Sequence, residues 1–216
     1  MPDFAAARER MIERHIAGRG LTDPALLAAF RAVPREVFVG QADSHRAYED
    51  GPLPIPAEQT ISQPYIVALM IHLARVQPGD RLLEVGAGSG YAAAVLSRIA
   101  GGVVAVERHR ELASLAAERI ERLGYDNVRI LHGDGALGVP AAAPFDAIIL
   151  SAAAPEVPPA LPGQLRRGGA LVMPQGGAQD VQRLVRIVRR EDDAGFDREE
   201  LGAVRFVPLV AGKVGP

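Results

Sequence analysis

The chain has no cysteine among its 216 residues. This absence excludes disulfide bonds, zinc ribbons, iron–sulfur clusters and thiol catalysis together, and it suits a reducing compartment. Histidine is scarce as well: the five histidines are scattered, and none lies at metal-ligand spacing from another histidine or an acid. We therefore expect no metal site.

An excess of charge and long apolar runs are also missing. The chain carries 24 Lys and Arg residues against 26 Asp and Glu residues, a net charge of −2. This balance argues against non-specific electrostatic binding to nucleic acid or to an anionic membrane. No apolar run approaches the roughly 18 residues of a membrane helix, and no apolar signal core follows the N-terminus. We expect a cytoplasmic monomer without nucleic-acid or membrane partners.

The length predicts one large domain, or a core with a small accessory part. Residues 1–79 are expected to form helices, at 3–17 and 64–75 among others, and a turn-rich loop over 40–64 that packs on the core. Repeated prolines in that loop argue against long helices or central strands. Residues 80–216 are expected to form the core itself, continuous with the first part.

From residue 80 the sequence alternates between short β-rich runs and helical patterns. Strands are expected at residues 81–85, 103–107, 128–131, 145–151 and 170–173, and helices at 91–100, 111–123 and 159–165. Such alternation indicates an α/β fold, a mostly parallel doubly wound sheet covered on both faces. Residues 181–190 and 203–210, separated by an acidic turn, are expected to form an antiparallel hairpin at the sheet edge.

The strongest local motif is the glycine turn Gly86-Ala87-Gly88-Ser89-Gly90, which follows a predicted strand and opens a predicted helix. Glycines let a backbone turn tightly and approach a ligand closely, and a helix N-terminus offers free N–H groups. A dinucleotide-binding fingerprint needs glycine or alanine at position 91, where Tyr91 stands. Rossmann-like S-adenosylmethionine-dependent methyltransferases instead carry a Gly-x-Gly-x-Gly turn. A plain strand-to-helix turn without a ligand stays open at this point.

Two acids follow the next two predicted strands. Glu107 ends the second strand, where its carboxylate can accept hydrogen bonds from both hydroxyls of a ribose. Asp134 lies between two glycines after the third strand, where it can hold the exocyclic amine of an adenine. With the glycine turn, the two acids describe an adenosine site without a phosphate binder. The alternative for Glu107 is a strand-end acid that only contacts solvent, and the alternative for Asp134 is an ordinary Gly-Asp-Gly turn.

Further motifs extend over roughly residues 20–210, namely 33–39, 47–50, 53–55, 60–65, 83–91, 132–135, 143–149, 152–158 and 206–209. On these segments the chain resembles one family, the protein-L-isoaspartate (D-aspartate) O-methyltransferases. Thr60-Ile61-Ser62-Gln63-Pro64-Tyr65 together with Ala143-Pro144-Phe145-Asp146 is close to family-specific. The chain departs from the family over residues 54–58, where small flexible residues are usual. This departure leaves loop closure and the range of acceptor peptides open.

The resemblance implies a protein-repair enzyme. It would transfer a methyl group from S-adenosylmethionine to the free α-carboxylate of isoaspartyl residues in damaged proteins or peptides, leaving S-adenosyl-L-homocysteine; D-aspartyl residues are a further candidate acceptor. The ester would collapse to a succinimide that reopens in part to aspartate. By resemblance Ser62 is the active-site residue. The expected cofactor-binding residues are Gln59, Thr60, Ser62, Glu84, Gly86, Gly88, Ser89, Gly90, Glu107, Arg108, Asp134 and Gly135.

The chemistry of the acceptor agrees with this assignment. An α-carboxylate has a pKa of about 3.5 and is ionised at pH 7, so no strong general base is needed. Alignment and the exclusion of water should dominate the reaction. The Ser62 hydroxyl can donate one hydrogen bond to the acceptor carboxylate, so we expect Ser62 to position the acceptor and not to act as a nucleophile. The alternative is that Ser62 caps the helix that begins near Pro64.

Three other functions stay open on the sequence alone. The first is a Rossmann-like methyltransferase acting on a small molecule, RNA or a modified peptide, for which the altered lead-in over residues 54–58 leaves room. The second is a nicotinamide-dependent oxidoreductase, against which Tyr91 argues. The third is a non-catalytic module that binds the cofactor or damaged peptides, against which Ser62, Glu107 and Asp134 argue.

Overall fold

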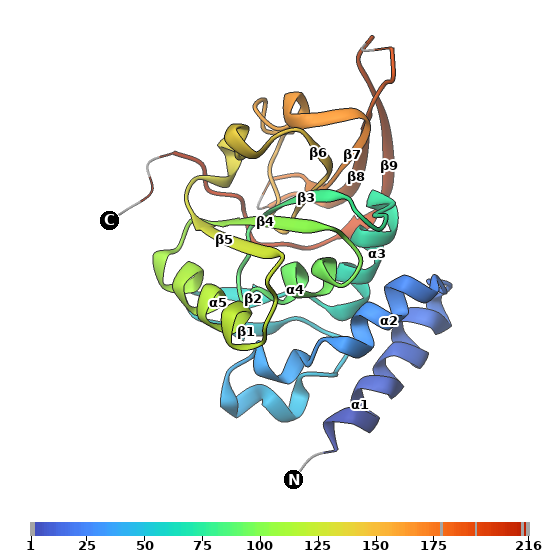
Figure 1. The fold of residues 1–216 in the computed structure, drawn as a ribbon, viewed down its shortest axis with the longest axis vertical. Coiled ribbons are helices and arrows are strands. Elements are labelled where there is room, and N and C mark those ends of the chain that lie inside the picture. Colours follow the sequence, from blue (N-terminus) through green and yellow to red (C-terminus); the bar gives the residue numbers. More distant parts are fainter. Residues whose placement is uncertain (1–2, 178, 193, 213, 215–216) are drawn as a thin grey trace.

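A computed structural model describes residues 3–177, 179–192, 194–212 and 214, and a seven-stranded sheet lies at the centre of this part of the chain (Figure 1). Its strands are Arg81–Val85 (β3), Gly102–Glu107 (β4), Val128–His132 (β5), Phe145–Leu150 (β6), Leu165–Gln175 (β7), Gln182–Arg189 (β8) and Phe196–Val204 (β9). Their spatial order is β5-β4-β3-β6-β7-β8-β9. The first five of these run parallel, and β8 and β9 each pair antiparallel with the preceding strand. The expected sheet, mostly parallel with a C-terminal antiparallel hairpin, is confirmed.

The direction of strand addition reverses at β3. The chain passes from β3 outward to β4 and β5, and then returns to place β6 on the other side of β3. Leu83 accordingly pairs with Val104 on β4 and with Ile148 on β6. Ligands of open parallel sheets bind at such a reversal, in the crevice beyond the carboxyl ends of the strands. The glycine turn that follows β3 therefore lies at the expected crevice.

The helices of the sheet region lie on one face of the sheet. Together with the N-terminal helices they are Phe4–Met11 (α1), Pro24–Ala32 (α2), Pro64–Ala74 (α3), Tyr91–Ser97 (α4) and Arg110–Arg122 (α5). Figure 1 shows α3, α4 and α5 against that face, with α1 and α2 outside them. The helices expected at 3–17, 64–75, 91–100 and 111–123 are confirmed, although α1 passes into a π-helical turn at Ile12–Ile16. No helix among the described residues is both long and apolar enough for a membrane span.

Short 3₁₀ turns cover the opposite face, at Gly135–Leu137, Pro140–Ala142 and Pro162–Gln164. The helix expected over residues 159–165 is wrong, because only its last part forms a 3₁₀ turn. Pro162 interrupts the run, and a proline inside a helix removes a donor and clashes with the preceding turn. The buried Gln164 side chain bonds this region instead: its Nε2 donates to the Leu137 and Ala160 carbonyls at 2.9 Å, and its Oε1 accepts from the Val139 N–H at 2.8 Å.

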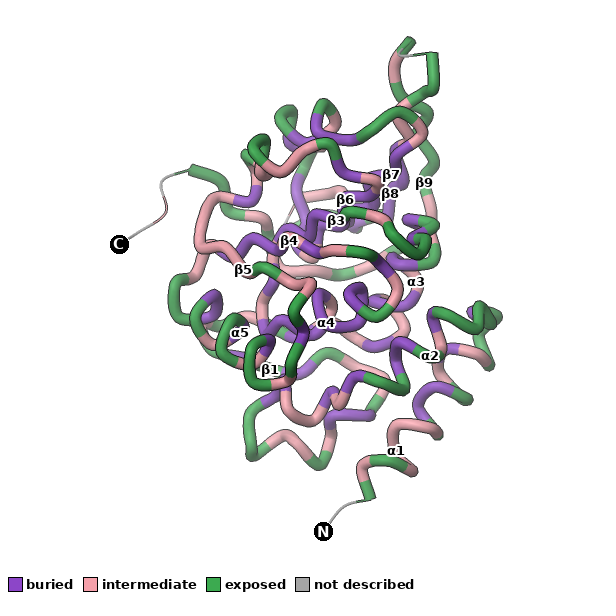
Figure 2. Tube along the Cα trace, in the orientation of Figure 1, coloured by how far each residue is buried: buried purple, intermediate pink, exposed green. Residues whose placement is uncertain are grey.

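Side chains are packed on both faces of the central strands. Successive residues of a strand point to opposite faces, and Leu82 accordingly packs with the helices while Leu83 packs beneath the 3₁₀ turns. Figure 2 shows the central strands largely buried. The helix-side core also contains Met11 and Phe30, which belong to the same cluster as Leu96 of α4. Residues from the first 79 positions therefore share a core with the sheet.

The turn-rich segment over residues 40–64 contains a small hairpin of Leu53–Ile55 (β1) and Gln59–Ile61 (β2). The sequence correctly predicts the lack of a long helix or central strand here, but it does not predict the hairpin. Ala57 and Glu58 in its turn have φ angles of 57° and 56°, in the left-handed region that favours glycine. Both residues belong to the segment that departs from the family pattern. Without glycine, the turn is strained by about 1–2 kcal/mol per residue.

The C-terminal hairpin is present, but its second strand lies earlier than expected. The sequence predicts residues 203–210, whereas β9 ends at Val204. Residues 196–200 of β9 are exposed and mostly charged, so this edge strand lacks the apolar pattern that marks buried strands. The apolar residues that follow pack against the loop after β6, where the Ala153 N–H donates to the Val207 carbonyl at 2.8 Å and the Ala153 carbonyl accepts from the Leu209 N–H at 2.6 Å. The chain after β9 thus runs back toward β5 (Figure 1).

Candidate functional site

Three cavities adjoin one another at the carboxyl ends of β3, β4 and β6. The main cavity is lined by Gln59, Thr60, Val85, Gly86, Gly88, Val106, Glu107, Arg108, His109, Gly135, Ser151, Ala152 and residues 207–210. The loop cavity is lined by Thr60, Ile61, Ser62, Val67, Glu84, Gly86, Ala87, Gly88, Ser89, Tyr91, Ala92 and Ser151. The hairpin groove is lined by Pro52, Thr60, Ser62, Gln63, Ile66, Ser151 and residues 203–207. Because Thr60 and Ser151 line all three, the cavities form one cleft.

The glycine turn has a backbone path that other residues rarely follow. Gly86, Gly88 and Gly90 have φ angles of +88°, +54° and +88°, all in the left-handed region. Gly90 is the residue before α4, which begins at Tyr91. The path brings the backbone against its neighbours, because a Cβ on Gly88 would lie 3.4 Å from Cδ1 of Ile55 on β1. The three glycines are therefore required by the turn itself.

Glu107 connects this turn to the next loop of the sheet. Its carboxylate Oε2 accepts a hydrogen bond from the Gly88 N–H at 2.9 Å, and its Oε1 accepts one from the His109 N–H at 2.9 Å. The residue is only 5% exposed, yet it lines the main cavity. A carboxylate has about four lone-pair positions, so each oxygen can accept a further hydrogen bond from a ligand. The acid and the glycine turn that the sequence singles out lie in direct contact.

Glu84 is a second, more deeply buried acid in the cleft. Only 1% of the residue is exposed, and it lines the loop cavity. Its Oε1 accepts a hydrogen bond from the Ser151 hydroxyl at 3.3 Å, whereas its Oε2 has no partner among the described residues. Burial, with a smaller contribution from the nearby Glu107 charge, raises the pKa of Glu84 to about 8. An unpartnered buried carboxyl oxygen at a cavity wall is suited to a cationic ligand group.

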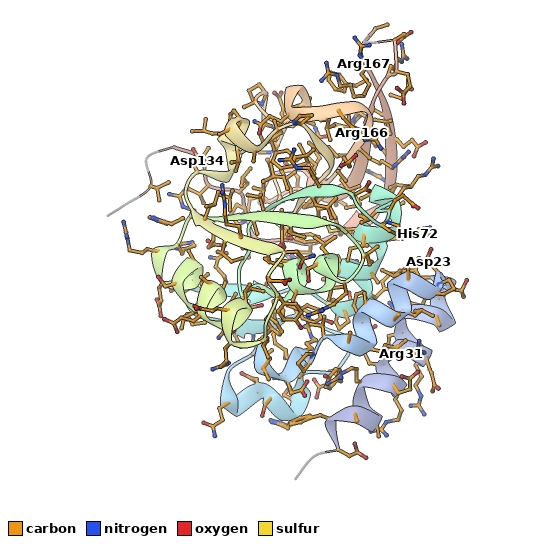
Figure 3. All side chains as sticks on the ribbon, viewed as in Figure 1. Asp23, Arg31, His72, Asp134, Arg166 and Arg167 are labelled. Carbon is orange, nitrogen blue, oxygen red and sulfur yellow. The ribbon has the colours of Figure 1, made fainter. Side chains whose placement is uncertain are left out.

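Asp134 lies at the carboxyl end of β5, beside the C-terminal segment (Figure 3). Its Oδ1 accepts from the Ala136 N–H at 2.9 Å, and its Oδ2 accepts from the Gly212 N–H at 2.8 Å. The Arg108 guanidinium donates to the Val210 carbonyl of the same segment. Asp134 and Arg108 thus hold the C-terminal segment against the main cavity, which residues 207–210 help to line.

The structure brings most of the predicted site residues into the cleft. The predicted residues that line the main cavity or the loop cavity are Gln59, Thr60, Ser62, Glu84, Gly86, Gly88, Ser89, Glu107, Arg108 and Gly135. Gly90 and Asp134 do not line either of them, although each is adjacent in sequence to a residue that does. No group of three or more acids and histidines suited to a metal ion is found in the described part of the chain. The assignment of these residues to a cofactor stays a prediction.

Ser62 lines both the loop cavity and the hairpin groove. The alternative that it caps the following helix is wrong, because α3 begins at Pro64 with Gln63 at the cap position. Contacts from the N-terminal part hold this segment in place: Gln63 Nε2 donates to the Asp50 carbonyl at 3.2 Å, and the Arg19 guanidinium lies 4.6 Å from the ring centre of Tyr65. Asp50 and Arg19 thus hold two residues that follow Ser62, and with them the position of Ser62.

Sequence reasoning did not assign Ser151, His109 or residues 207–210 to the cleft. Ser151 directly follows β6, and the rule that places functional residues at the carboxyl ends of parallel strands would have found it. Residues 206–209 belong to the family resemblance, but nothing in the sequence places residues 207–210 in the main cavity, because main-chain contacts with Ala153 bring them there. His109, whose N–H is bound by Glu107, also lines that cavity.

The buried Glu84 carboxyl predicts a pH-dependent stability. Its pKa in the folded chain, about 8, lies above the usual 4.5, so its contribution to the free energy of unfolding is full below pH 4.5 and is lost as the pH rises through 8. Glu84→Gln cannot ionise and should gain stability relative to the parent chain from about pH 5 to about pH 8, by at most about 1.4 kcal/mol per pH unit. Urea unfolding of both chains across this range measures the difference. A difference that does not change with pH would contradict the raised pKa.

Known proteins resemble the chain in sequence and in fold. A family model described as protein-L-isoaspartate (D-aspartate) O-methyltransferase matches residues 6–214. A protein-L-isoaspartate O-methyltransferase of Rhodopseudomonas palustris is 55% identical over 203 residues, which cover 94% of this chain and 93% of the relative. A solved protein-L-isoaspartate O-methyltransferase has a TM-score of 0.84 at 31% identity, covering 96% of this chain and 67% of that chain. A β-aspartate methyltransferase of Plasmodium falciparum, solved with S-adenosyl-L-homocysteine, has a TM-score of 0.81 at 26% identity, covering 97% of this chain and 99% of that chain. The chain belongs to the protein-L-isoaspartate (D-aspartate) O-methyltransferase family.

Proposed function

We propose that the main cavity and the loop cavity together bind S-adenosylmethionine, and that the chain methylates the free α-carboxylate of isoaspartyl residues in damaged proteins. The observation that carries this proposal is the Glu107 carboxylate, which lines the main cavity while the Gly88 and His109 N–H groups hold it in place. An acid fixed beside a glycine turn suits the two hydroxyls of a ribose. The activity agrees with the names of the matched relatives.

The other residues of the cleft fit the remainder of that cofactor. Its methionine part carries an ammonium group, for which the unpartnered Glu84 Oε2 in the loop cavity is the suited acceptor. Gly86 and Gly88 line both cavities, so the glycine turn lies between the ribose and methionine positions. When bound, the cofactor supplies an electrophilic methyl group. The further residues proposed to contact it are Gln59, Thr60, Ser62, Ser89, Gly90, Arg108, Asp134 and Gly135.

The acceptor needs positioning more than activation. Its α-carboxylate is ionised at neutral pH, since such groups have a pKa of about 3.5. Ser62 lines the loop cavity and the hairpin groove, so its hydroxyl lies between the cofactor side and the acceptor side of the cleft. One hydrogen bond from this hydroxyl fixes the attacking oxygen, and such alignment lowers the barrier of a two-reactant step.

Both parts of the chain contribute to this reaction. Residues 1–79 provide Thr60 and Ser62, and residues 80–216 provide the glycine turn and Glu107. We further propose that the chain acts as a cytoplasmic monomer, without nucleic-acid or membrane partners. The near-neutral net charge of −2 supports the lack of a nucleic-acid partner.

Two peptides that differ only in aspartate versus isoaspartate test the proposed function. With methyl-labelled S-adenosylmethionine, we expect a base-labile methyl ester on the isoaspartyl peptide and none on the aspartyl peptide, because only the isoaspartyl linkage leaves an α-carboxylate free within the chain. Labelled methanol released by mild base measures the ester. No release from the isoaspartyl peptide would contradict the proposal.

Ser62→Ala tests the positioning role. Loss of one hydrogen bond to a charged group, about 1.5–3 kcal/mol, should lower kcat by roughly 10- to 100-fold with little change in cofactor affinity. Initial rates at saturating peptide give kcat, and calorimetry gives the cofactor Kd. Ser114→Ala, at an exposed position of α5, is the matched control and should leave both unchanged. An unaltered kcat in Ser62→Ala would refute the role.

Glu107→Gln tests the ribose contact. The side-chain amide would point its NH₂ donor at either the Gly88 or the His109 N–H, and one accepting oxygen would be lost. We expect S-adenosylmethionine to bind more weakly by over ~1 kcal/mol. Calorimetry measures the Kd, with Glu111→Gln at an exposed position as the matched control. Equal affinities for the parent chain and Glu107→Gln would rule the contact out.

A further inference from the structure

One cation lies on the acceptor side of the cleft. Among the described residues that line the hairpin groove, Arg205 is the only charged one, and its neighbours there include the apolar Ile66 and Phe206. The groove shares Ser62 with the loop cavity. Arg205, in contrast, lines neither the loop cavity nor the main cavity. Ser62 therefore lies where the loop cavity meets the hairpin groove, and Arg205 lies in the groove, outside the two proposed cofactor cavities.

The backbone around Arg205 is fixed on both sides. The preceding residue, Val204, pairs with Gln182 in the ladder between β8 and β9. The following residue, Phe206, is bound by the side chain of the same buried glutamine: Gln182 Nε2 donates to the Phe206 carbonyl at 3.0 Å, and Oε1 accepts from the Phe206 N–H at 2.6 Å. Val207 is held in turn by the Ala153 N–H. An exposed arginine thus stands on an anchored backbone.

The guanidinium of Arg205 has no hydrogen bond or ion pair with any residue in the described part of the chain. Other arginines of the same hairpin are engaged: Arg198 donates to Glu200 at 2.7 Å and to Gln175 at 3.1 Å, and Arg186 donates to the Leu73 carbonyl at 2.8 Å. A guanidinium presents several donors in a fixed plane that matches a carboxylate. Arg205 is therefore available to an acidic ligand in the groove.

We propose that Arg205 is a specificity-determining residue that binds an acidic side chain next to the isoaspartyl residue of the acceptor protein. This inference rests on the proposed function. The position beyond Ser62 places the guanidinium against a neighbour of the methylated residue. A guanidinium bound to the methylated carboxylate itself would withdraw negative charge from the attacking oxygen, so a flanking acid fits the arrangement better.

Two pairs of isoaspartyl peptides test the inference. Within each pair the peptides differ only in Glu or Gln beside the isoaspartyl residue, and this variable residue precedes the isoaspartyl residue in one pair and follows it in the other. For the parent chain we expect a higher kcat/KM for the Glu peptide of one pair, by about three- to fivefold, as for a partly exposed ion pair. The difference should reside in KM and shrink at high salt. In Arg205→Gln the ratio should fall to about one, and Arg205→Lys should keep part of it.

Arg129→Gln is the matched control. Arg129 is exposed and lines a different cavity, at the amino ends of the strands, so this variant removes the same charge and should keep the parent ratio. Equal kcat/KM values for Glu and Gln peptides in the parent chain, or an undiminished ratio in Arg205→Gln, would overturn the inference. Methylation of none of the peptides by the parent chain would instead overturn the proposed function.

Discussion

The hydrogen bond from the Gly88 N–H to the Glu107 carboxylate, 2.9 Å long, is the contact on which the cleft depends. Parallel pairing sets Val85 beside Val106, so the loops after β3 and β4 leave the sheet together and one carboxylate can reach both. The second oxygen accepts from the His109 N–H, immediately before α5. The left-handed glycines make this geometry accessible to the backbone. The Glu107 side chain therefore joins the glycine turn to the segment that opens α5, and the Val106 carbonyl holds the same turn by accepting from the Gly86 and Ala87 N–H groups.

Two glutamates of the cleft have opposite environments, and the environments assign their roles. Glu107 accepts hydrogen bonds from two backbone N–H groups, which fix the direction of its carboxylate. Glu84 is buried, its Oε1 accepts from the Ser151 hydroxyl, and burial raises its pKa to about 8. A cationic group in the loop cavity would relieve the cost of ionising Glu84. The cleft therefore favours a ligand with a cation beside the glycine turn and hydroxyl groups next to it, which is the layout of S-adenosylmethionine.

The sequence predicts the cofactor half of the cleft well, because local signals determine it. The glycine turn and Glu107 follow buried strands, and parallel pairing alone brings their ends together. In the acceptor half the sequence marks Ser62 through the motif at residues 60–65, but the contacts that place the surrounding segments join distant residues and leave no local pattern. The tail reaches the main cavity through the backbone of Ala153 and the side chain of Gln182, and the hairpin before Ser62 turns through residues that seldom adopt positive φ. The prediction from apolar composition therefore places the last strand at residues 203–210 instead of 196–204. The helix predicted over residues 159–165 does not form, because closely spaced prolines limit this segment to a 3₁₀ turn.

A crystal structure of the chain with S-adenosyl-L-homocysteine is the most direct test of the proposed site. The expected result places both ribose hydroxyls within hydrogen-bond distance of the Glu107 carboxylate and the amino nitrogen beside Glu84, with the sulfur facing Ser62. Such a result would join the two cavities by one ligand across the glycine turn. A nucleoside bound elsewhere, or one whose ribose makes no contact with Glu107, would contradict it.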